Sequence, residues 1–161
     1  MMFRNLSIED LKTNLVDIID DFININFTLH PKAISETANK KIRNGDVILT
    51  FSHSKLVERV LLDAVVSGKK IKVIVSDGRP QQLGRRLTDR LVQADVHTTY
   101  ILSTAVSQVS SHLHIYHQTV ILIFQVLPSV TKVLLGCDGV MANGCVLATV
   151  GTSQVRSALM K

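Results

Sequence analysis

The sequence predicts an α/β protein, in which N-terminal helices precede an incomplete Rossmann-like parallel sheet with helices on both faces. Two observations predict this class. A chain of 161 residues, 46% of them hydrophobic, is long enough to bury the core of one domain. From residue 46 onward, short β-rich runs alternate with amphipathic segments of about ten residues or more, which is typical of parallel strands joined by helices.

Residues 1–44 are expected to form a helical lead-in. Apolar residues in 7–22 recur at the spacing of a helix with one buried stripe, and Ser7 with Asp10 fits an N-terminal cap. A second helix should begin near Pro31, since proline suits a first helical turn, and should stop at Asn44 and Gly45. These helices look like an approach to the main domain rather than a site.

Residues 45–161 are expected to form the partial Rossmann-like domain. Strands are predicted at 46–50, 70–76, 98–102 and 131–136, and helices at 54–68, at 82–94 and from about 103. Ligands of such sheets bind at the carboxyl ends of the strands.

The residues that follow the predicted strands are rich in hydroxyl groups, glycine and arginine. On one rim of the sheet, hydroxyls, helix N-terminal N–H groups and arginines would suit a phosphate group. The alternative is that the serines only cap a helix and the glycines only make turns. The candidate phosphate-binding residues are Ser52, His53, Ser54, Arg79, Arg85, Asp138, Asn143, Gly144, Gly151 and Thr152.

Composition argues against several functional classes. The net charge of +5, from 18 basic and 13 acidic residues, is not gathered into a basic block interleaved with aromatic residues, so no direct nucleic-acid binding is expected. No apolar run approaches the roughly 20 residues of a membrane span. Two cysteines and a polar, charged start predict a cytoplasmic protein in the reducing cytosol. We expect no cofactor and no metal.

Three motifs carry a resemblance to a known family. These are NGDVILTFSHSKLVERVLLDAVVSGKKIKVIVSDGRP, the GRR that follows, and VLPSVTKVLLGCDGVMANGCVLATVGTSQV. Together they resemble the family that joins the alpha, beta and delta regulatory subunits of translation initiation factor 2B to the isomerases of methylthioribose 1-phosphate and ribose 1,5-bisphosphate. The resemblance covers residues 34–161, and VLPSVTKVLLG with ANG and VGTSQ is most similar to the delta branch.

The isomerase branch can be tested on its chemistry. Its members resemble one another in placing a catalytic cysteine after the first strand and an aspartate in a GAD turn after the fourth. The aspartate position is Asp138 here, but Ser52 occupies the cysteine position, and a serine hydroxyl has no low-pKa thiolate to offer. We therefore expect no catalytic residue. A sugar-phosphate isomerase relative and a phosphometabolite-binding regulator stay as alternatives.

The resemblance implies a regulatory, non-catalytic subunit of the guanine-nucleotide exchange factor that acts on initiation factor 2. The implied partners are the homologous alpha and beta subunits, the gamma and epsilon subunits, of which epsilon catalyses exchange, and initiation factor 2, especially its phosphorylated alpha subunit. Pairing would use an apolar strand-and-helix face, and surface loops with the N-terminal helices would bind the substrate factor.

The chain also departs from the family pattern. The motif SRPxxEGR appears with Arg79, Pro80, Gly84 and Arg85, but Leu83 replaces its acidic residue. Since the family continues through further strands beyond VGTSQV, we expect a truncated form whose sheet has an unpaired edge.

Residues 109–125 interrupt the match. These 17 residues carry no charge, and removing them joins AVSQ to VLPSV and restores the family pattern without a gap. Val-Ser at the start can be encoded as an intron donor and Gln at the end as an acceptor, so we hypothesise a translated intron. One alternative is an extra strand at 119–124. Another is a metal site on His112, His114 and His117, disfavoured because the segment has no Cys, Asp or Glu.

Overall fold

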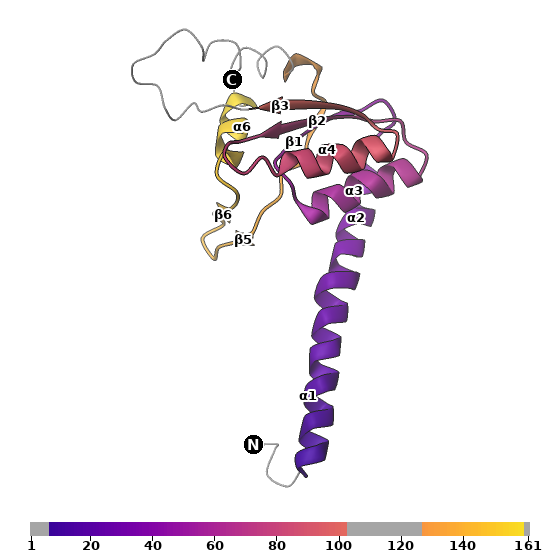
Figure 1. Cartoon of the computed structure of the whole chain (residues 1–161), viewed down its shortest axis with the longest axis vertical. Coiled ribbons are helices and arrows are strands. Elements are labelled where there is room, and N and C mark those ends of the chain that lie inside the picture. Colours follow the sequence, from indigo (N-terminus) through magenta and orange to yellow (C-terminus); the bar gives the residue numbers. More distant parts are fainter. Residues whose placement is uncertain (1–6, 103–126, 160–161) are drawn as a thin grey trace.

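The computed structural model describes residues 7–102 and 127–159, and within them the predicted fold class is confirmed (Figure 1). A parallel sheet of four strands in the order β3-β2-β1-β4 has helices on both faces. A long helix projects from this body. The hypothesised insertion 109–125 and the helix expected from about 103 lie outside the described residues.

The two N-terminal helices expected from the sequence are present, and a π-helical segment joins them into one continuous rod. They are α1 (Ile8–Ile23), a π-helical segment η1 (Asn24–Leu29) and α2 (His30–Lys41). Inside a regular α-helix, the ring of a proline such as Pro31 would clash with the carbonyl group four residues earlier. The wider π turn, in which the His30 N–H donates to the Ile25 carbonyl, carries the chain into Pro31 without a break. At the other end of α1, the Ser7 side chain and Asp10 form the expected cap.

The four strands lie close to their predicted positions, apart from the last. They are β1 (Val47–Phe51), β2 (Lys72–Asp77), β3 (His97–Leu102) and β4 (Lys132–Val133). β4 is shorter than the predicted 131–136, because its ladder with β1 contains only the pairs Ile48↔Lys132 and Leu49↔Val133.

Alternate residues of the strands point into two cores on opposite faces of the sheet. On one face, Leu61 of α3 (Lys55–Val66) and Leu87 and Leu91 of α4 (Gly84–Gln93) are fully buried. On the other, Val155 of α6 (Thr152–Leu159) packs with Phe51 and neighbouring strand residues. Burying each large side chain stabilises the fold by about 1.5–3 kcal/mol. The two cores therefore hold the strand ends in fixed positions.

Two smaller features complete the described fold. A short 3-10 helix, η2 (Leu127–Ser129), precedes β4, and β5 (Gly139–Val140) pairs with β6 (Val146–Leu147) in an antiparallel hairpin.

In residues 7–102 and 127–159, no helix has both the length and the apolar character that crossing a bilayer requires.

Candidate functional site

The order β3-β2-β1-β4 creates a switch point between β1 and β4. From β1 the chain passes through α3 to β2 on one side, whereas β4 adds on the other side. The connections that leave the carboxyl ends of β1 and β4 therefore diverge, and open α/β sheets bind ligands at such a point. Two neighbouring hollows lie here, and both are bordered by Phe51 and Thr149.

The first, which we name the switch-point hollow, has a volume of about 210 Å³. It is lined by Phe51, His53, Ser54, Lys55, Gly136, Cys137, Asp138, Thr149 and Thr152. The second, the turn hollow, has a volume of about 340 Å³ and is lined by Phe51, Ser52, Asp77, Gly78, Arg79, Pro80, Gln81, Thr149 and Val150. The structure thus brings six of the ten predicted rim residues to these two hollows.

Ser52 has a strained backbone at the end of β1. Its φ is +57°, a conformation that side-chain-bearing residues adopt at a cost of about 1 kcal/mol or more. The Ser52 N–H donates to the Ser76 carbonyl at 2.7 Å, and only 5% of the residue is exposed. Strain of this kind concentrates at functional sites, which makes the carboxyl end of β1 the centre of the candidate site.

His53 and Ser54 are held differently at the start of α3. The His53 Nε2 lies 2.7 Å from the Glu58 carboxylate, which also pairs with Arg90 at 3.1 Å, so the imidazole is tied to α3 and α4. Ser54 is the N-terminal cap residue of α3, but its side chain makes no capping hydrogen bond. A Cβ on Gly136 would lie 2.7 Å from the Ser54 Cβ, so glycine at 136 allows the loop after β4 to pass close to Ser54.

Asp77 organises the turn after β2. Its buried carboxylate accepts hydrogen bonds from the Gly84 N–H at 2.7 Å and from the Tyr100 hydroxyl at 3.1 Å. Burial raises the pKa of Tyr100, the negative charge of Asp77 raises it further, and the Arg85 guanidinium acts in the opposite direction. Asp77 therefore joins the start of α4 to β2 and β3, a role that the sequence analysis missed although an aspartate directly after a strand could have signalled it.

The two arginines of the predicted rim separate in the structure. Arg79, which precedes Pro80 in a cis peptide, lines the turn hollow. Arg85 does not line either hollow, and its effect on the pKa of Tyr100 places it beside that hydroxyl. Arg79 is thus the arginine positioned for a ligand of the turn hollow.

The predicted site residues that follow β4 also separate into two groups in the structure. Asp138 and Thr152 line the switch-point hollow, whereas Asn143 and Gly144 form the tip of the β5–β6 hairpin. The Asn143 Oδ1 accepts from the Cys145 N–H at 3.0 Å, and Gly144 has a φ of +81°. Asn-Gly between apolar residues is typical of a hairpin turn. The alternative given by the sequence, that such residues only make turns, therefore fits Asn143 and Gly144.

Gly151 shapes the site without lining a hollow. Its φ is +108°, and a Cβ there would lie 2.3 Å from the Phe51 Cζ. The chain can therefore pass directly over the Phe51 ring, which brings Thr149 and Thr152 to the hollows.

The switch-point hollow has hydrogen-bond donors that could bind an anion. Lys55 and the hydroxyls of Ser54, Thr149 and Thr152 surround the switch-point hollow at the start of α3, where N–H groups of the first turn lack helical partners. Lys55 and Thr149 were missed from the sequence, although Lys55 directly follows the predicted cap. In the part of the chain that the structure describes, no group of three His, Cys, Asp or Glu side chains could hold a metal ion.

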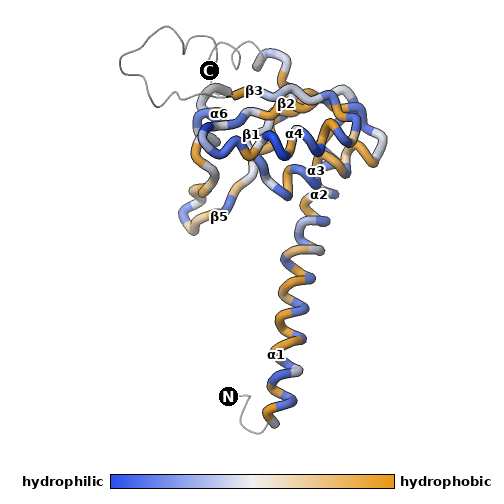
Figure 2. The backbone as a smooth tube through the Cα atoms, viewed as in Figure 1, coloured by the Kyte–Doolittle hydropathy of each residue, from blue (hydrophilic) through white to orange (hydrophobic). Residues whose placement is uncertain are grey.

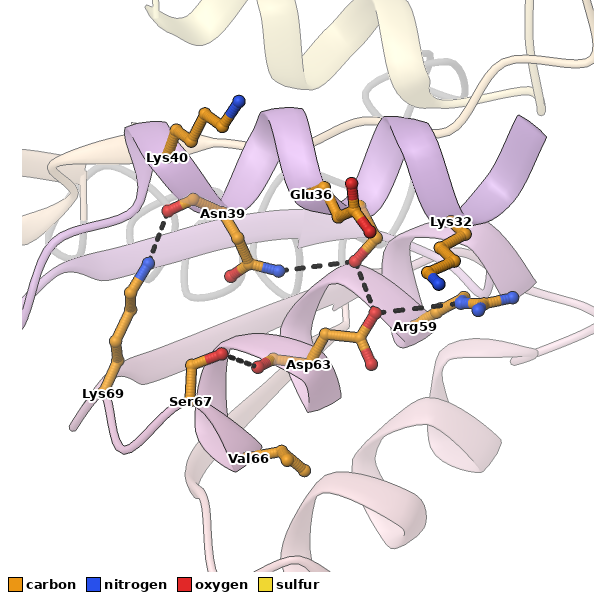
Figure 3. Close-up of a pocket in the computed structure, with 10 residues that line it drawn as sticks. Lys32, Glu36, Asn39, Lys40, Arg59, Asp63, Val66, Ser67 and Lys69 are labelled. Atoms are coloured by element: carbon orange, nitrogen blue, oxygen red, sulfur yellow. Dashed lines mark hydrogen bonds and ion pairs between the residues drawn. The ribbon is translucent and has the colours of Figure 1, made fainter. Parts of the chain in front are cut away.

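A third hollow, of about 690 Å³, lies between α2 and α3 (Figure 3). The Ser35 hydroxyl donates to Asp63 at 2.5 Å, Asn39 donates to Ser35 at 3.3 Å, and the Lys69 ammonium donates to the Asn39 carbonyl. Because these polar groups bind one another across the two helices, we name them the α2–α3 seam and assign them to anchoring the helical rod.

Comparison with known proteins gives a family match and several relatives. The model of the initiation factor 2 subunit family matches residues 2–159. The chain is 35% identical to translation initiation factor eIF2B subunit delta of Dictyostelium discoideum, over 96% of this chain and 22% of that protein. It is 31% identical to the same subunit of Schizosaccharomyces pombe, over 94% and 29%. Ribose 1,5-bisphosphate isomerase of Pyrococcus furiosus is 30% identical, over 94% and 41%.

Solved structures are similar over nearly all of the chain. The crystal structure of eIF2B delta from Chaetomium thermophilum gives a TM-score of 0.77 at 29% identity, over 97% of this chain and 51% of that one. The tetrameric eIF2B-beta2-delta2 complex from the same fungus gives 0.78 at 29% identity, over 97% and 45%. The chain therefore spans less than half of these relatives and about half of the solved chains.

Proposed function

The chain belongs to the initiation factor 2 subunit family, and from this premise we propose that it is a regulatory, non-catalytic subunit of the guanine-nucleotide exchange factor for translation initiation factor 2. The observation that carries the proposal is the similarity of 97% of the chain to a delta-subunit structure and to a chain of a beta2-delta2 complex. The proposed partners are the homologous alpha and beta subunits, the gamma and epsilon subunits, and initiation factor 2 with its phosphorylated alpha subunit. The proposed compartment is the cytosol.

The geometry of the candidate site supports the non-catalytic part of this proposal. Ser52, which stands at the position of the isomerase cysteine, lines the turn hollow, whereas Asp138 lines the switch-point hollow. Proton transfer across one sugar needs both groups at the same bound substrate. A serine hydroxyl, unlike a thiol, is scarcely ionised at neutral pH, so Ser52 is a poor substitute for the isomerase cysteine.

Co-expression with the beta subunit of the same organism tests the proposal. The expected result is that the two chains elute together in size-exclusion chromatography, while beta and an unrelated Rossmann-like chain of similar size elute apart. Circular dichroism of the separated chain first establishes that it is folded. A folded chain that elutes alone in the presence of beta contradicts the proposal.

A second candidate function is binding of a phosphorylated sugar as a regulatory ligand. The uncapped Ser54 and Lys55 support it, because they bring hydrogen-bond donors and one positive charge to the switch-point hollow, opposite the carboxylate of Asp138, while the strained Ser52 lines the neighbouring turn hollow. Calorimetry with ribose 1,5-bisphosphate should then give heat that inorganic phosphate competes away. Lys55→Gln should abolish this heat. Lys72→Gln, at the amino end of β2 and so at the opposite end of the strands from the site, should preserve it. No heat with the unaltered chain removes this candidate.

A further inference from the structure

The strand β4 is joined to the sheet by fewer backbone pairs than the other strands. The ladder between β1 and β2 has five pairs and that between β2 and β3 has six, whereas β1 and β4 share two. One hydrogen bond of 2.9 Å extends the short ladder at each end. The Thr131 N–H donates to the Val47 carbonyl, and the Leu134 N–H does so to the Leu49 carbonyl. The position of β4 therefore depends more on side-chain contacts than the positions of β2 and β3 do.

Apolar packing holds β4 only in part. Val133 and Leu135 pack against one core of the sheet and Leu134 packs against the other, but all three side chains are partly rather than fully buried. The stabilisation from burial scales with the apolar area that is removed from water. Each of these residues therefore contributes less than a fully buried strand residue such as Ile48 or Val73, which leaves a larger share of the attachment to polar contacts.

A group of polar side chains joins β1 to β4 at the amino ends of both strands. β1 itself is hydrophobic along most of its length (Figure 2), but Asp46, directly before it, is a carboxylate residue that is only 7% exposed. One of its oxygens accepts a hydrogen bond from the Thr131 hydroxyl at 2.8 Å, and the other lies 3.0 Å from the Lys132 ammonium. Hydrogen bonds to a charged group are about twice as strong as those between neutral groups. We name Asp46, Thr131 and Lys132 the Asp46 clasp.

The chain that leaves β4 forms one wall of the switch-point hollow. Gly136, Cys137 and Asp138 line the hollow, and they follow the last residue of β4 closely in the sequence. A Cβ at Gly136 would lie 2.7 Å from the Ser54 Cβ, so this wall already lies against the start of α3. A shift of β4 away from β1 would therefore move the wall away from Ser54 and widen the hollow.

We propose that the Asp46 clasp is a positioning device, which sets the width of the switch-point hollow from the opposite end of the strands. With the clasp closed, β4 is held against β1 and residues 136–138 lie close to Ser54. With the clasp broken, β4 separates from β1 and the hollow widens. Asp46 lies about 20 Å from Ser52 at about 3.3 Å per residue of strand, so the effect travels through β4 and not by direct contact. This inference does not rest on the proposed function.

A double-mutant cycle tests this connection. Gly136→Ala places a Cβ against Ser54 and should destabilise the chain, because the clasp keeps the loop after β4 from moving. In a chain that also carries Asp46→Asn, the loss of stability from Gly136→Ala in urea unfolding should fall to about half or less, although substitutions more than about 10 Å apart otherwise contribute additively. Gly84→Ala, which places a Cβ against Asp77 in the turn after β2, is the matched control. Its effect should be the same with and without Asp46→Asn.

Hydrogen exchange measures the opening of β4 directly. The Leu134 N–H binds β1, so the rate of its exchange reports the separation of the two strands. Asp46→Asn and Thr131→Val should each accelerate this exchange about tenfold. Asp63→Asn is the matched control, since Asp63 also accepts a hydrogen bond from a hydroxyl group and pairs with an arginine, but at the α2–α3 seam. It should leave the exchange of the Leu134 N–H unchanged.

Three results would overturn the proposal. The first is a cycle in which the effects of Asp46→Asn and Gly136→Ala simply add. The second is an equal coupling of Asp46→Asn to Gly84→Ala, which would show a general loosening of the fold. The third is an exchange rate at Leu134 that neither clasp variant raises, or that Asp63→Asn raises as much. If Gly136→Ala does not fold, the exchange measurement decides alone, because Thr131→Val leaves the loop after β4 unaltered.

Discussion

Replacing Gly84 with alanine tests the role of Asp77 at the start of α4. The new Cβ would lie 2.9 Å from both the Asp77 Cγ and one of its carboxylate oxygens, and 3.0 Å from a methyl carbon of Val75. Because Asp77 is 1% exposed, its carboxylate cannot move into solvent without rearrangement of the turn. The substitution should therefore break the hydrogen bonds that Asp77 accepts from the Gly84 N–H and from Tyr100.

The size of the effect follows from these contacts. A hydrogen bond to a charged group contributes about 1.5–3 kcal/mol, and alanine recovers up to about 1 kcal/mol through its higher helix propensity. With partial relaxation of the turn, Gly84→Ala should lower the free energy of unfolding by about 2–4 kcal/mol, a large part of the stability of a domain. The pKa of Tyr100 should also fall toward its ordinary value of 10.0, because the Asp77 charge moves away from the hydroxyl.

Urea unfolding followed by circular dichroism measures the first effect, and tyrosinate absorbance measured as a function of pH gives the second. Gly139→Ala is the matched control, since a Cβ at Gly139 meets nothing within 4 Å and its φ is ordinary. The reasoning fails if Gly84→Ala and Gly139→Ala are equally stable, or if the pKa of Tyr100 in a destabilised Gly84→Ala variant is the same as in the unaltered chain.

Three further predictions concern the ends of β1 and the segment that interrupts the family pattern. Burial acts to raise the pKa of Asp46, but hydrogen bonds from the Arg43 N–H, Lys132 and Thr131 outweigh it and hold the pKa below 3.8. Asp46→Asn should therefore cost about 1–2 kcal/mol at neutral pH. This loss should vanish as the pH falls through the folded-state pKa of the unaltered chain, which stability curves against pH would show; parallel curves contradict it. Ser52→Gly should stabilise the chain by about 1 kcal/mol in urea unfolding, because glycine adopts the φ of +57° without strain, and a loss of stability would count against strain at this residue. For residues 109–125, which we propose to be intron-encoded, sequencing of transcripts across the junction should find messages that join Gln108 to Val126, and their absence from every tissue would contradict the proposal.

The sequence predicted the fold best where the hydrophobic period is strong. The apolar runs that became β1, β2 and β3 lie within two residues of their predicted bounds. In β1 and β2 both faces of the strand are buried, which gives a continuous apolar run, whereas β3 is an edge strand with alternating exposure. The two predicted N-terminal helices correspond to α1 and α2, but the π-helical segment η1 that joins them into one rod was not predicted. Pro31 carries a local signal for a helix start, but the π turn before it removes the steric conflict, and such a turn has no simple sequence pattern.

Only part of the candidate site could be predicted from the sequence, because strand ends can be located from local patterns but the directions of side chains cannot. Strand ends converge by topology, so Ser52, Ser54 and Arg79 could be placed on one rim from the strand order alone. Whether a side chain then faces a hollow depends on contacts distant in sequence. Arg85 turns to Tyr100 in this way, 15 residues away in the sequence.

The continuous rod also acts as a lever. From Ile8 to His30 a helix rises about 33 Å, so a tilt of about 10° where α2 meets α3 would move the tip of α1 by about 6 Å. That angle is held by the packing of Ala38 against the core and by polar contacts that include the 2.5 Å hydrogen bond from Ser35 to Asp63. A small change in the way α2 meets α3 would thereby become a large displacement at the far end of the rod, at the start of α1.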